Sequence, residues 1–307
     1  MRARLGRPDL DQYQDLFDVP AAGDGDLSVT FLGVSTLLLD DGATQILFDG
    51  FFSRPSLLSV GLRKIAPDTA RIDAMLERAG VRRVAAVVPV HSHYDHAMDA
   101  AVVALRTGAD LVGGESTANI GRGGGLDDDR VVVVSSGDEV VHGDFTLTLI
   151  ASEHCPPDRY PGTITSPVVP PVKVGAYRCG EAWSVLVSHA GGRSCLVQGS
   201  AGSVPGALDG LSADLAYLGV GQLGLQSEEY IRSYWHDTVT AVGARHAVLI
   251  HWDDFFGPPD EPRRALPFAA DDLDATLRVL RELSDEHDVS LHLPTLLRRE
   301  DPWRLGR

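Results

Sequence analysis

Four side chains able to bind a metal ion fall within six residues of the sequence, at His91, His93, Asp95 and His96. Alternate residues of an extended chain point in the same direction, so His91 and His93 can share one ion. A turn after them can direct Asp95 and His96 toward an adjacent position. Imidazole nitrogens suit zinc and other transition metals, and one carboxylate adds a harder ligand. The segment predicts one or two divalent metal ions, zinc before manganese or iron.

The elements around this segment decide where the four side chains lie. The apolar run VAAVVPV at residues 84–90 directly precedes them, and such a run is typical of a strand covered on both faces. Further strands are expected at residues 27–32, 36–39, 44–48, 131–134, 139–141, 145–150, 183–187, 194–197, 214–218 and 247–250, and helices at residues 72–79, 97–106, 227–242 and 270–284. Strands followed by helices, twice over, predict two sheet halves with helices on the outside.

The chain is expected to form a short arm followed by one domain. Residues 1–25, rich in Asp, Gly and Pro, read as a surface arm, and residues 26–307 as the domain. The segment 155–173 contains six prolines, a density that excludes helix and central strand. Long loops of this kind in compact domains are usually functional or disordered. Since this one directly follows His154, we expect it to cover the site.

Composition excludes several classes of partner. The 307 residues carry a formal charge of −16, which repels phosphate backbones and anionic lipid, so no nucleic-acid partner is expected. No uncharged apolar run approaches the roughly 18 residues that span a bilayer, and no signal peptide is apparent. The three cysteines are an odd number with no CxxC spacing, so no disulfide framework is indicated and a reducing cytoplasm suits the count. A cytoplasmic protein with a small-molecule substrate is expected, of unknown oligomeric state.

The pattern HxHxDH after a strand resembles the metallo-β-lactamase-fold superfamily, and the resemblance extends along most of the chain. It implies an α/β fold, the four-layer αβ/βα sandwich of the metallo-β-lactamase type. The segment around Asp49 resembles the early acidic motif, whose aspartate orients a ligand without binding the ion. The resemblance also implies that His154 completes a three-histidine site with His91 and His93. Likewise, His251 would join Asp95 and His96.

One motif departs from the family. Ser200, in the segment CLVQGSAG, stands where the family usually has an aspartate that bridges two metal ions. A neutral hydroxyl supplies no bridging charge, so metal affinity falls. Either the second ion binds weakly and the chain works with one, or other carboxylates compensate. The candidates for compensation are Asp99, Glu153, Asp253 and Asp254.

These ligands predict hydrolysis. A three-histidine site leaves a position for water, whose pKa the metal lowers, and the resulting hydroxide can attack a small ester, lactone, amide or phosphodiester. With one ion, Asp95 would instead orient or deprotonate the water, the catalytic role assigned to it here. The alternative is a non-catalytic metal- or ligand-binding protein that retains the hydrolase fold. Among family branches, the layout looks closest to the ascorbate-phosphate lactonases and the N-acylethanolamine-lipid phospholipase D enzymes.

Substrate contacts are the least constrained part of the prediction. On the proline-rich loop, Arg159 and Tyr160 could meet a carboxylate or phosphate, although an exposed arginine is more often solvated. Trp252 could form an apolar wall, as could Phe255 and Phe256, but core packing explains these aromatic residues equally well. The sequence GVGQLG at residues 219–224 matches a dinucleotide-binding pattern. Its last glycine precedes the expected helix, and no ribose-binding acid follows the next strand. A loop near the metal site is therefore favoured.

Overall fold

Two seven-stranded sheets form the centre of the molecule. The computed structural model describes residues 4–306. The first sheet has the order β14-β1-β2-β3-β4-β5-β6, with strands at Arg299–Glu300, Ser28–Phe31, Leu37–Asp40, Gln45–Phe48, Val84–Val88, Asp110–Gly113 and Val131–Val133. The second has the order β13-β12-β11-β10-β9-β8-β7, with strands at Ser290–His292, His246–Ile250, Leu215–Gly219, Ser194–Gln198, Ala182–His189, Phe145–Ser152 and Glu139–His142.

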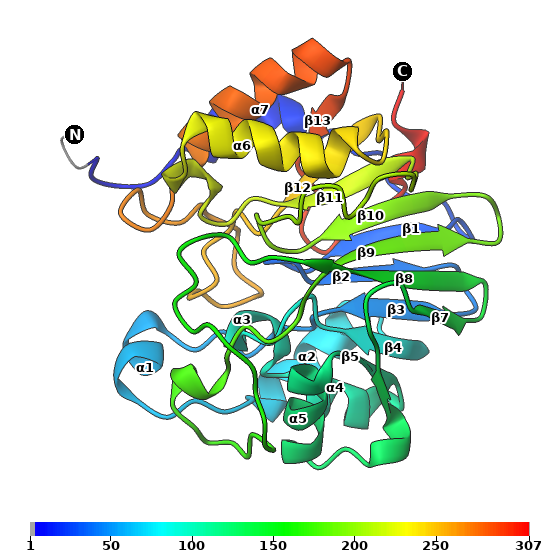
Figure 1. Cartoon of the computed structure of the whole chain (residues 1–307), viewed down its shortest axis with the longest axis vertical. Coiled ribbons are helices and arrows are strands. Elements are labelled where there is room, and N and C mark those ends of the chain that lie inside the picture. Colours follow the sequence, from blue (N-terminus) through cyan, green and yellow to red (C-terminus); the bar gives the residue numbers. More distant parts are fainter. Residues whose placement is uncertain (1–3, 307) are drawn as a thin grey trace.

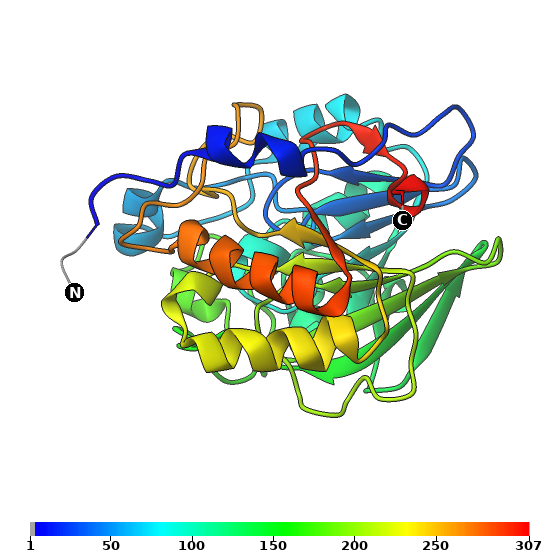
Figure 2. The same ribbon diagram turned by 90° about the horizontal axis from the view of Figure 1, so that it is seen from above.

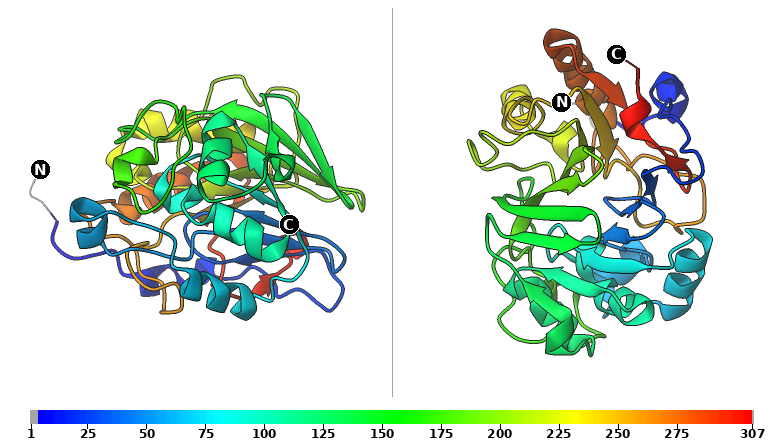
Figure 3. Two further views of the ribbon diagram at one scale, coloured as in Figure 1. Left: turned by 90° about the horizontal axis from the view of Figure 1, so that it is seen from below. Right: turned by 90° about the vertical axis from the view of Figure 1, so that its right-hand side faces the viewer.

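Helices cover the outer face of each sheet, as Figure 1 and the right-hand view of Figure 3 show. On the first sheet lie α2, α4 and α5, at Thr69–Arg78, Ala100–Thr107 and Glu115–Gly123. On the second lie α6 and α7, at Glu228–Trp235 and Leu273–His287, which run side by side in Figure 2. Two short helices, α1 at Leu57–Leu62 and α3 at Tyr94–Ala97, lie toward one edge of the sheets. The architecture is therefore the expected four-layer αβ/βα sandwich.

The largest apolar core fills the space between the two sheets. Phe31 and Phe48 of the first sheet and Phe145 and Val197 of the second belong to it. A second core joins the first sheet to its helices through residues such as Val87. Since strands β3 and β4 are buried on both faces, their apolar runs are required by the layered packing.

The predicted helix at 227–242 corresponds to α6 followed by one π-helical turn, His236–Thr240. The segment before β1 differs from the expected surface arm. It forms a 3₁₀ helix at Leu10–Leu16, and Tyr13, Leu16 and Val19 are buried in the main core. Their apolar side chains offset the polar composition that predicted an arm. The 1–25 and 26–307 boundaries themselves remain a prediction. Within residues 4–306, no helix combines the length and apolar character needed to cross a bilayer.

Candidate metal centre

Strand direction brings the predicted ligands to one edge. In the first sheet β3 and β4 are parallel, and in the second β8 and β10 both run antiparallel to β9 while β10, β11 and β12 are parallel. Strands that run in one direction end at one edge, where α/β proteins place their sites. The residues of interest follow the ends of these strands: Asp49 after β3, His91 after β4, His154 after β8, Ser200 after β10 and His251 after β12.

The first ligand group contains His91, His93 and His154. One nitrogen from each ring lies within 4.8 Å of the other two. His91 Nε2 and His93 Nδ1 are 3.1 Å apart. In a tetrahedral zinc site with Zn–N bonds of 2.0–2.1 Å, two nitrogens lie roughly 3.3 Å apart. The three imidazoles therefore fit a single divalent ion.

The second group contains Asp95, His96 and His251 and meets the same 4.8 Å criterion. The two imidazole Nε2 atoms lie 3.3 Å apart, and Asp95 Oδ2 lies 3.7 Å from His96 Nε2 and 3.6 Å from His251 Nε2. Because the ring centroids of His91 and His96 are only 3.9 Å apart, the two groups adjoin. The two groups are candidate positions for two neighbouring divalent ions.

Asp49 determines which nitrogen of His96 faces the second group. Its Oδ2 lies 2.8 Å from His96 Nδ1, and its Oδ1 accepts a hydrogen bond from the backbone of Val90 at 2.9 Å. Since an ionised carboxylate only accepts, His96 Nδ1 carries hydrogen and Nε2 keeps its lone pair. Asp49 and His251 both adopt left-handed φ angles, 58° and 59°, and backbone strain of this kind clusters at functional sites.

Electrostatics keep most of the imidazoles neutral, the form that binds metal. Burial lowers the pKa of His91 well below its usual value, and the neighbouring imidazoles lower it further. Burial also lowers the pKa of His93 and takes that of His154 to about 4. Burial opposes charge on His96 as well, yet Asp49 and Asp95 raise its pKa. Asp95 stays ionised because His96 and His251 outweigh its burial and hold its pKa well below the usual range.

The comparisons with known proteins agree with this geometry. The sequence model described as the metallo-beta-lactamase superfamily matches residues 29–177, which contain His91, His93, Asp95, His96 and His154. The chain carries the metallo-β-lactamase fold, and just under half of it, residues 29–177, matches the model of that superfamily. No match was found among curated protein sequences.

Solved structures of this superfamily fold resemble nearly the whole chain. Igni18, a metallo hydrolase from Ignicoccus hospitalis, is 14% identical with a TM-score of 0.52, over 89% of this chain and 96% of that one. A protein described as a possible metal-dependent hydrolase from Veillonella parvula is 15% identical with a TM-score of 0.54, over 88% and 97%. CmlA, a diiron β-hydroxylase from Streptomyces venezuelae, is 13% identical with a TM-score of 0.53, over 90% and 54%. At these identities the likeness concerns the fold alone.

Ser200 lies outside both ligand groups of this metallo-β-lactamase fold. Its Oγ accepts a hydrogen bond from the backbone of Cys155 at 3.1 Å. Two of the carboxylates considered as compensation are already occupied: Asp99 accepts from Ser53 and Phe52, and Asp253 binds Arg54. Among the described residues, Asp95 is the single carboxylate in the two groups.

The three predicted substrate contacts lie in different environments. Arg159 is exposed, and the ring of Tyr160 lies 6.4 Å from that of His93. Trp252 is 1% exposed and packs against Phe17 and Phe31 in the core. Trp252 therefore does not form a wall of the site, because its apolar ring is used in core packing.

Two carboxylates near the ligands are not predicted by the sequence analysis, Asp158 and Asp271. Asp158 Oδ1 lies 3.2 Å from His93 Nε2. Asp271 is 2% exposed, and burial raises its pKa to about 6 while His251 acts in the opposite direction. Both residues belong to loop segments with no periodic pattern, and no short motif marks them.

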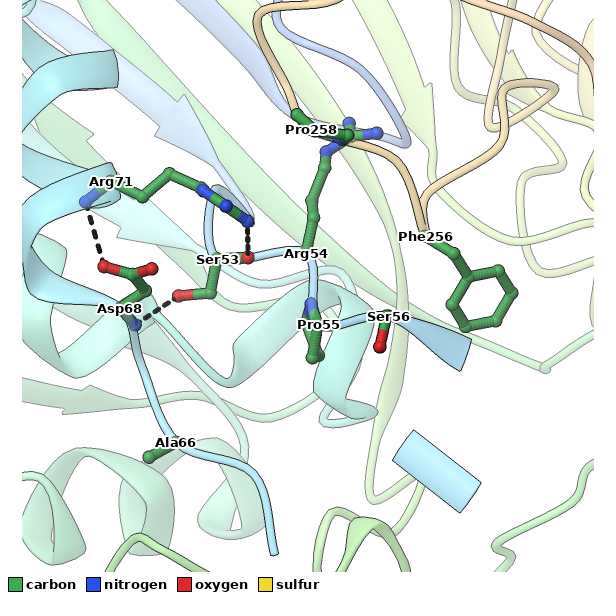
Figure 4. Close-up of a pocket in the computed structure, with 9 residues that line it drawn as sticks. All are labelled: Ser53, Arg54, Pro55, Ser56, Ala66, Asp68, Arg71, Phe256 and Pro258. Carbon is green, nitrogen blue, oxygen red and sulfur yellow. Dashed lines mark hydrogen bonds between the residues drawn. The ribbon is translucent and has the colours of Figure 1, made fainter. Parts of the chain in front are cut away.

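A cavity of about 400 Å³ lies between the chain after Phe52, the start of α2 and the loop around Pro258. Its polar groups already bind one another. Arg71 Nη1 donates to the Ser53 carbonyl at 2.6 Å, and the backbone of Asp68 donates to Ser53 Oγ at 2.6 Å, as Figure 4 shows. None of the metal-ligand candidates lines it.

Proposed function

We propose that the chain is a metal-dependent hydrolase of a small ester, lactone, amide or phosphodiester. The observation that carries this proposal is the pair of adjoining ligand groups at one sheet edge, one of three histidines and one of two histidines and an aspartate. A three-histidine group leaves a coordination position for water or substrate. In the proposal, His91, His93 and His154 hold one ion, and Asp95, His96 and His251 hold the other.

The two ligand groups differ in the charge of their side chains. A divalent ion, when bound, lowers the pKa of water and polarises the substrate oxygen. The three imidazoles of the first group, held neutral by burial, keep nitrogen lone pairs available to it. Asp95 is ionised and supplies negative charge to the second group. Its lowered pKa suits a ligand better than a proton acceptor, because an effective base has a pKa near the working pH.

Residues on two loops beside the ligands supply candidate substrate contacts. Arg159 and Tyr160 lie on the loop beside His93, where a cation and a phenol can contact a carboxylate or phosphate. The ring of Phe255 lies 5.7 Å from that of His251 and adds an apolar contact. A cation, a phenol and an apolar ring suit both the lactones and the phosphodiesters that the two resembled family branches imply.

The test uses the full chain stripped of metal with a chelator and reloaded with zinc, manganese or iron. Iron is included because CmlA, which shares the fold, is named as a diiron protein. We expect metal-dependent turnover of at least one class among chromogenic esters, lactones, amides and phosphodiesters. His154→Ala and His251→Ala should abolish it, while His236→Ala, at an exposed ring, should not. Stoichiometric metal binding without turnover would favour the non-catalytic binding protein. Absence of metal binding would overturn both functions.

A further inference from the structure

Asp158 approaches the metal centre from the proline-rich loop. The loop follows β8, and Asp158 reaches across to the side of the His93 ring opposite His91. Its Oδ1 lies 3.2 Å from His93 Nε2, and the carbonyl oxygen of Tyr160 lies 3.4 Å from the same nitrogen. The other ring nitrogen, Nδ1, faces His91 Nε2 at 3.1 Å. His93 therefore stands between a candidate ion position and two oxygen atoms.

The identity of those oxygens fixes the hydrogen on the ring. A carbonyl oxygen and an ionised carboxylate can only accept hydrogen bonds. His93 Nε2 makes its hydrogen bond to the Tyr160 carbonyl, and Asp158 Oδ1 lies within ion-pair distance of the same nitrogen. Nε2 therefore carries the hydrogen, and in a neutral imidazole the lone pair is left on Nδ1. That is the nitrogen directed at His91. We propose that Asp158 is a positioning residue of the metal centre: its carboxylate lies beside His93 Nε2 and holds the backbone of Tyr160, whose carbonyl accepts from Nε2, and together they favour the Nε2–H form of His93, so that Nδ1 binds the ion shared with His91 and His154.

Asp158 also places a negative charge beside the first ligand group. Three neutral imidazoles bring no negative charge to the first group, whereas the second contains Asp95 and is backed by Asp49. His154 offers no compensation, because its Nδ1 donates to the neutral carbonyl of Cys155 at 2.6 Å. Asp158 is the carboxylate within ion-pair distance of the first group, and Asp95 acts on the same rings from the second group. A negative charge behind a ligating imidazole raises its basicity and strengthens the metal bond.

The backbone holds Asp158 in place. Its Oδ1 accepts from the backbone of Tyr160 at 2.9 Å, and the Tyr160 carbonyl accepts from Cys179 at 2.9 Å. The Cys179 carbonyl in turn accepts at 2.8 Å from Ser92, the residue between His91 and His93. These hydrogen bonds connect the loop to the segment that carries His91 and His93. The same backbone contacts therefore position Asp158 and His93.

The same residues do not form a separate metal site. His93, Asp158 and Cys179 also bring ligand atoms within 4.8 Å of one another. Binding there would need the lone pair of His93 on Nε2, and a neutral imidazole with its lone pair on Nε2 has none on Nδ1 for the first group. Burial, together with Asp158 and Glu181, also raises the pKa of the Cys179 thiol to about 12, which disfavours the thiolate that binds metal.

This inference rests on the proposed metal centre. Its test distinguishes failure of the role proposed for Asp158 from failure of the proposed function. Zinc affinity and stoichiometry are measured by competition with a chromophoric chelator for the full chain and for Asp158→Ala and Asp158→Asn. The Asp9→Asn variant is the control, because Asp9 accepts from a backbone N–H two residues ahead in the same way. We expect Asp158→Ala to weaken one of the two zinc ions by about 10- to 100-fold. Asp158→Asn, which keeps an oxygen acceptor without the charge, should cause a smaller loss, and Asp9→Asn none.

A second measurement reports the hydrogen directly. In the metal-free protein, nitrogen-15 NMR of labelled histidines should find His93 in the Nε2–H form. The share of the Nδ1–H form should rise in Asp158→Ala, where the Tyr160 carbonyl is the one acceptor left at Nε2. Unchanged zinc affinity and an unchanged His93 form in that variant would overturn the inference while leaving the proposed function standing. Wild-type protein that binds no zinc would overturn the proposed function and this inference with it. The near-isosteric Asp158→Asn keeps the test decisive if the alanine variant does not fold.

Discussion

Gly221 lies directly against the imidazole of His251. A β-carbon at residue 221 would stand 2.7 Å from His251 Nδ1 and 3.1 Å from two ring carbons, closer than side chains pack. Gly219 likewise faces the backbone of Gly199, with a built β-carbon 2.6 Å from its carbonyl oxygen, and Gly224 faces Asp272. The glycine pattern that resembles a dinucleotide fingerprint is therefore explained by close packing, of Gly221 against His251 and of Gly219 and Gly224 against neighbouring backbone.

We expect Gly221→Ala to displace the His251 ring and to weaken the ion held by Asp95, His96 and His251. The three-histidine group should keep its affinity, since Gly221 does not touch it. Metal stoichiometry after dialysis measures this, with a fall from two retained ions toward one. Gly61→Ala is the control, because a β-carbon at residue 61 meets nothing within 4 Å. Equal retention in both variants would show that the His251 ring can move without cost.

The loop after His251 depends on a buried ion pair. Asp253 Oδ2 lies 3.1 Å from Arg54 Nη1, and both side chains are fully buried. Asp253 Oδ1 also accepts from the backbone of Val34 at 2.7 Å, and the Val34 carbonyl accepts from the backbone of His251 at 2.6 Å. This pair therefore fixes the backbone on which His251 is carried.

We expect Asp253→Ala to lower the free energy of unfolding by about 3–5 kcal/mol, because it leaves the buried charges of Arg54 and Arg263 without the carboxylate that they share. Urea denaturation of the metal-free protein measures the change. Asp73→Ala removes the exposed partner of Arg106, in a pair with both side chains 49% exposed, and should cost far less because solvent screens the pair. A loss for Asp253→Ala as small as for Asp73→Ala would contradict the buried-charge argument.

The buried histidines make the metal-free protein sensitive to acid. Burial lowers the pKa of His154 to about 4, from an ordinary value of about 6.5. Between these values the unfolded chain binds a proton that the folded chain does not, so stability falls as pH falls. A shift of this size corresponds to about 3 kcal/mol. His91 and His93 act in the same direction.

We therefore expect His154→Gln to lose less stability than the wild type between pH 7 and pH 4, by about 3 kcal/mol. The free energy of unfolding is measured at each pH in the presence of a chelator. His236→Gln, at a ring whose side chain is 75% exposed, should follow the wild type. Parallel curves for the wild type and His154→Gln would refute the burial of a neutral His154.

The fold is predictable from the sequence because its main strands and helices show clear patterns of apolar residues. The doubly buried strand β4 and the amphipathic helix α7 have clear apolar periodicity. Strand β5 and helix α5 were missed, since α5 contains two glycines and has weak helical propensity. It forms because Gly121 lets the helix approach Leu111 of β5, where a β-carbon would stand 2.7 Å from that side chain.

The candidate site was predictable to the extent that its residues follow strands in order. His91, His93, Asp95 and His96 form one local motif, and the family resemblance implied His154 and His251. Asp158 reaches His93 across 65 positions of sequence through a loop without periodicity. Trp252 lies beside His251 in sequence but turns into the core. Contacts of this kind depend on tertiary packing, which a local pattern does not encode.

The serine at position 200 leaves the two ligand groups with little negative charge. Asp95 is the one carboxylate among the six ligand candidates, while Ser200 Oγ is occupied by the backbone of Cys155. An aspartate here would add a charge beside two divalent ions, and at short range in a partly screened site this is worth several kcal/mol. The effect should fall on the more weakly held ion.

We expect Ser200→Asp to retain the second ion on the order of tenfold or more tightly than the wild type. Dialysis against graded chelator, followed by metal analysis, measures the retention of each ion. Ser203→Asp is the matched control, because it adds the same charge three residues away, where Ser203 Oγ binds Asp237. The same gain in both variants would mean that only net charge matters. No gain in Ser200→Asp would mean that another carboxylate already compensates for the missing charge. The double variant Ser200→Asp/Asp158→Asn then tests whether Asp158 is that carboxylate.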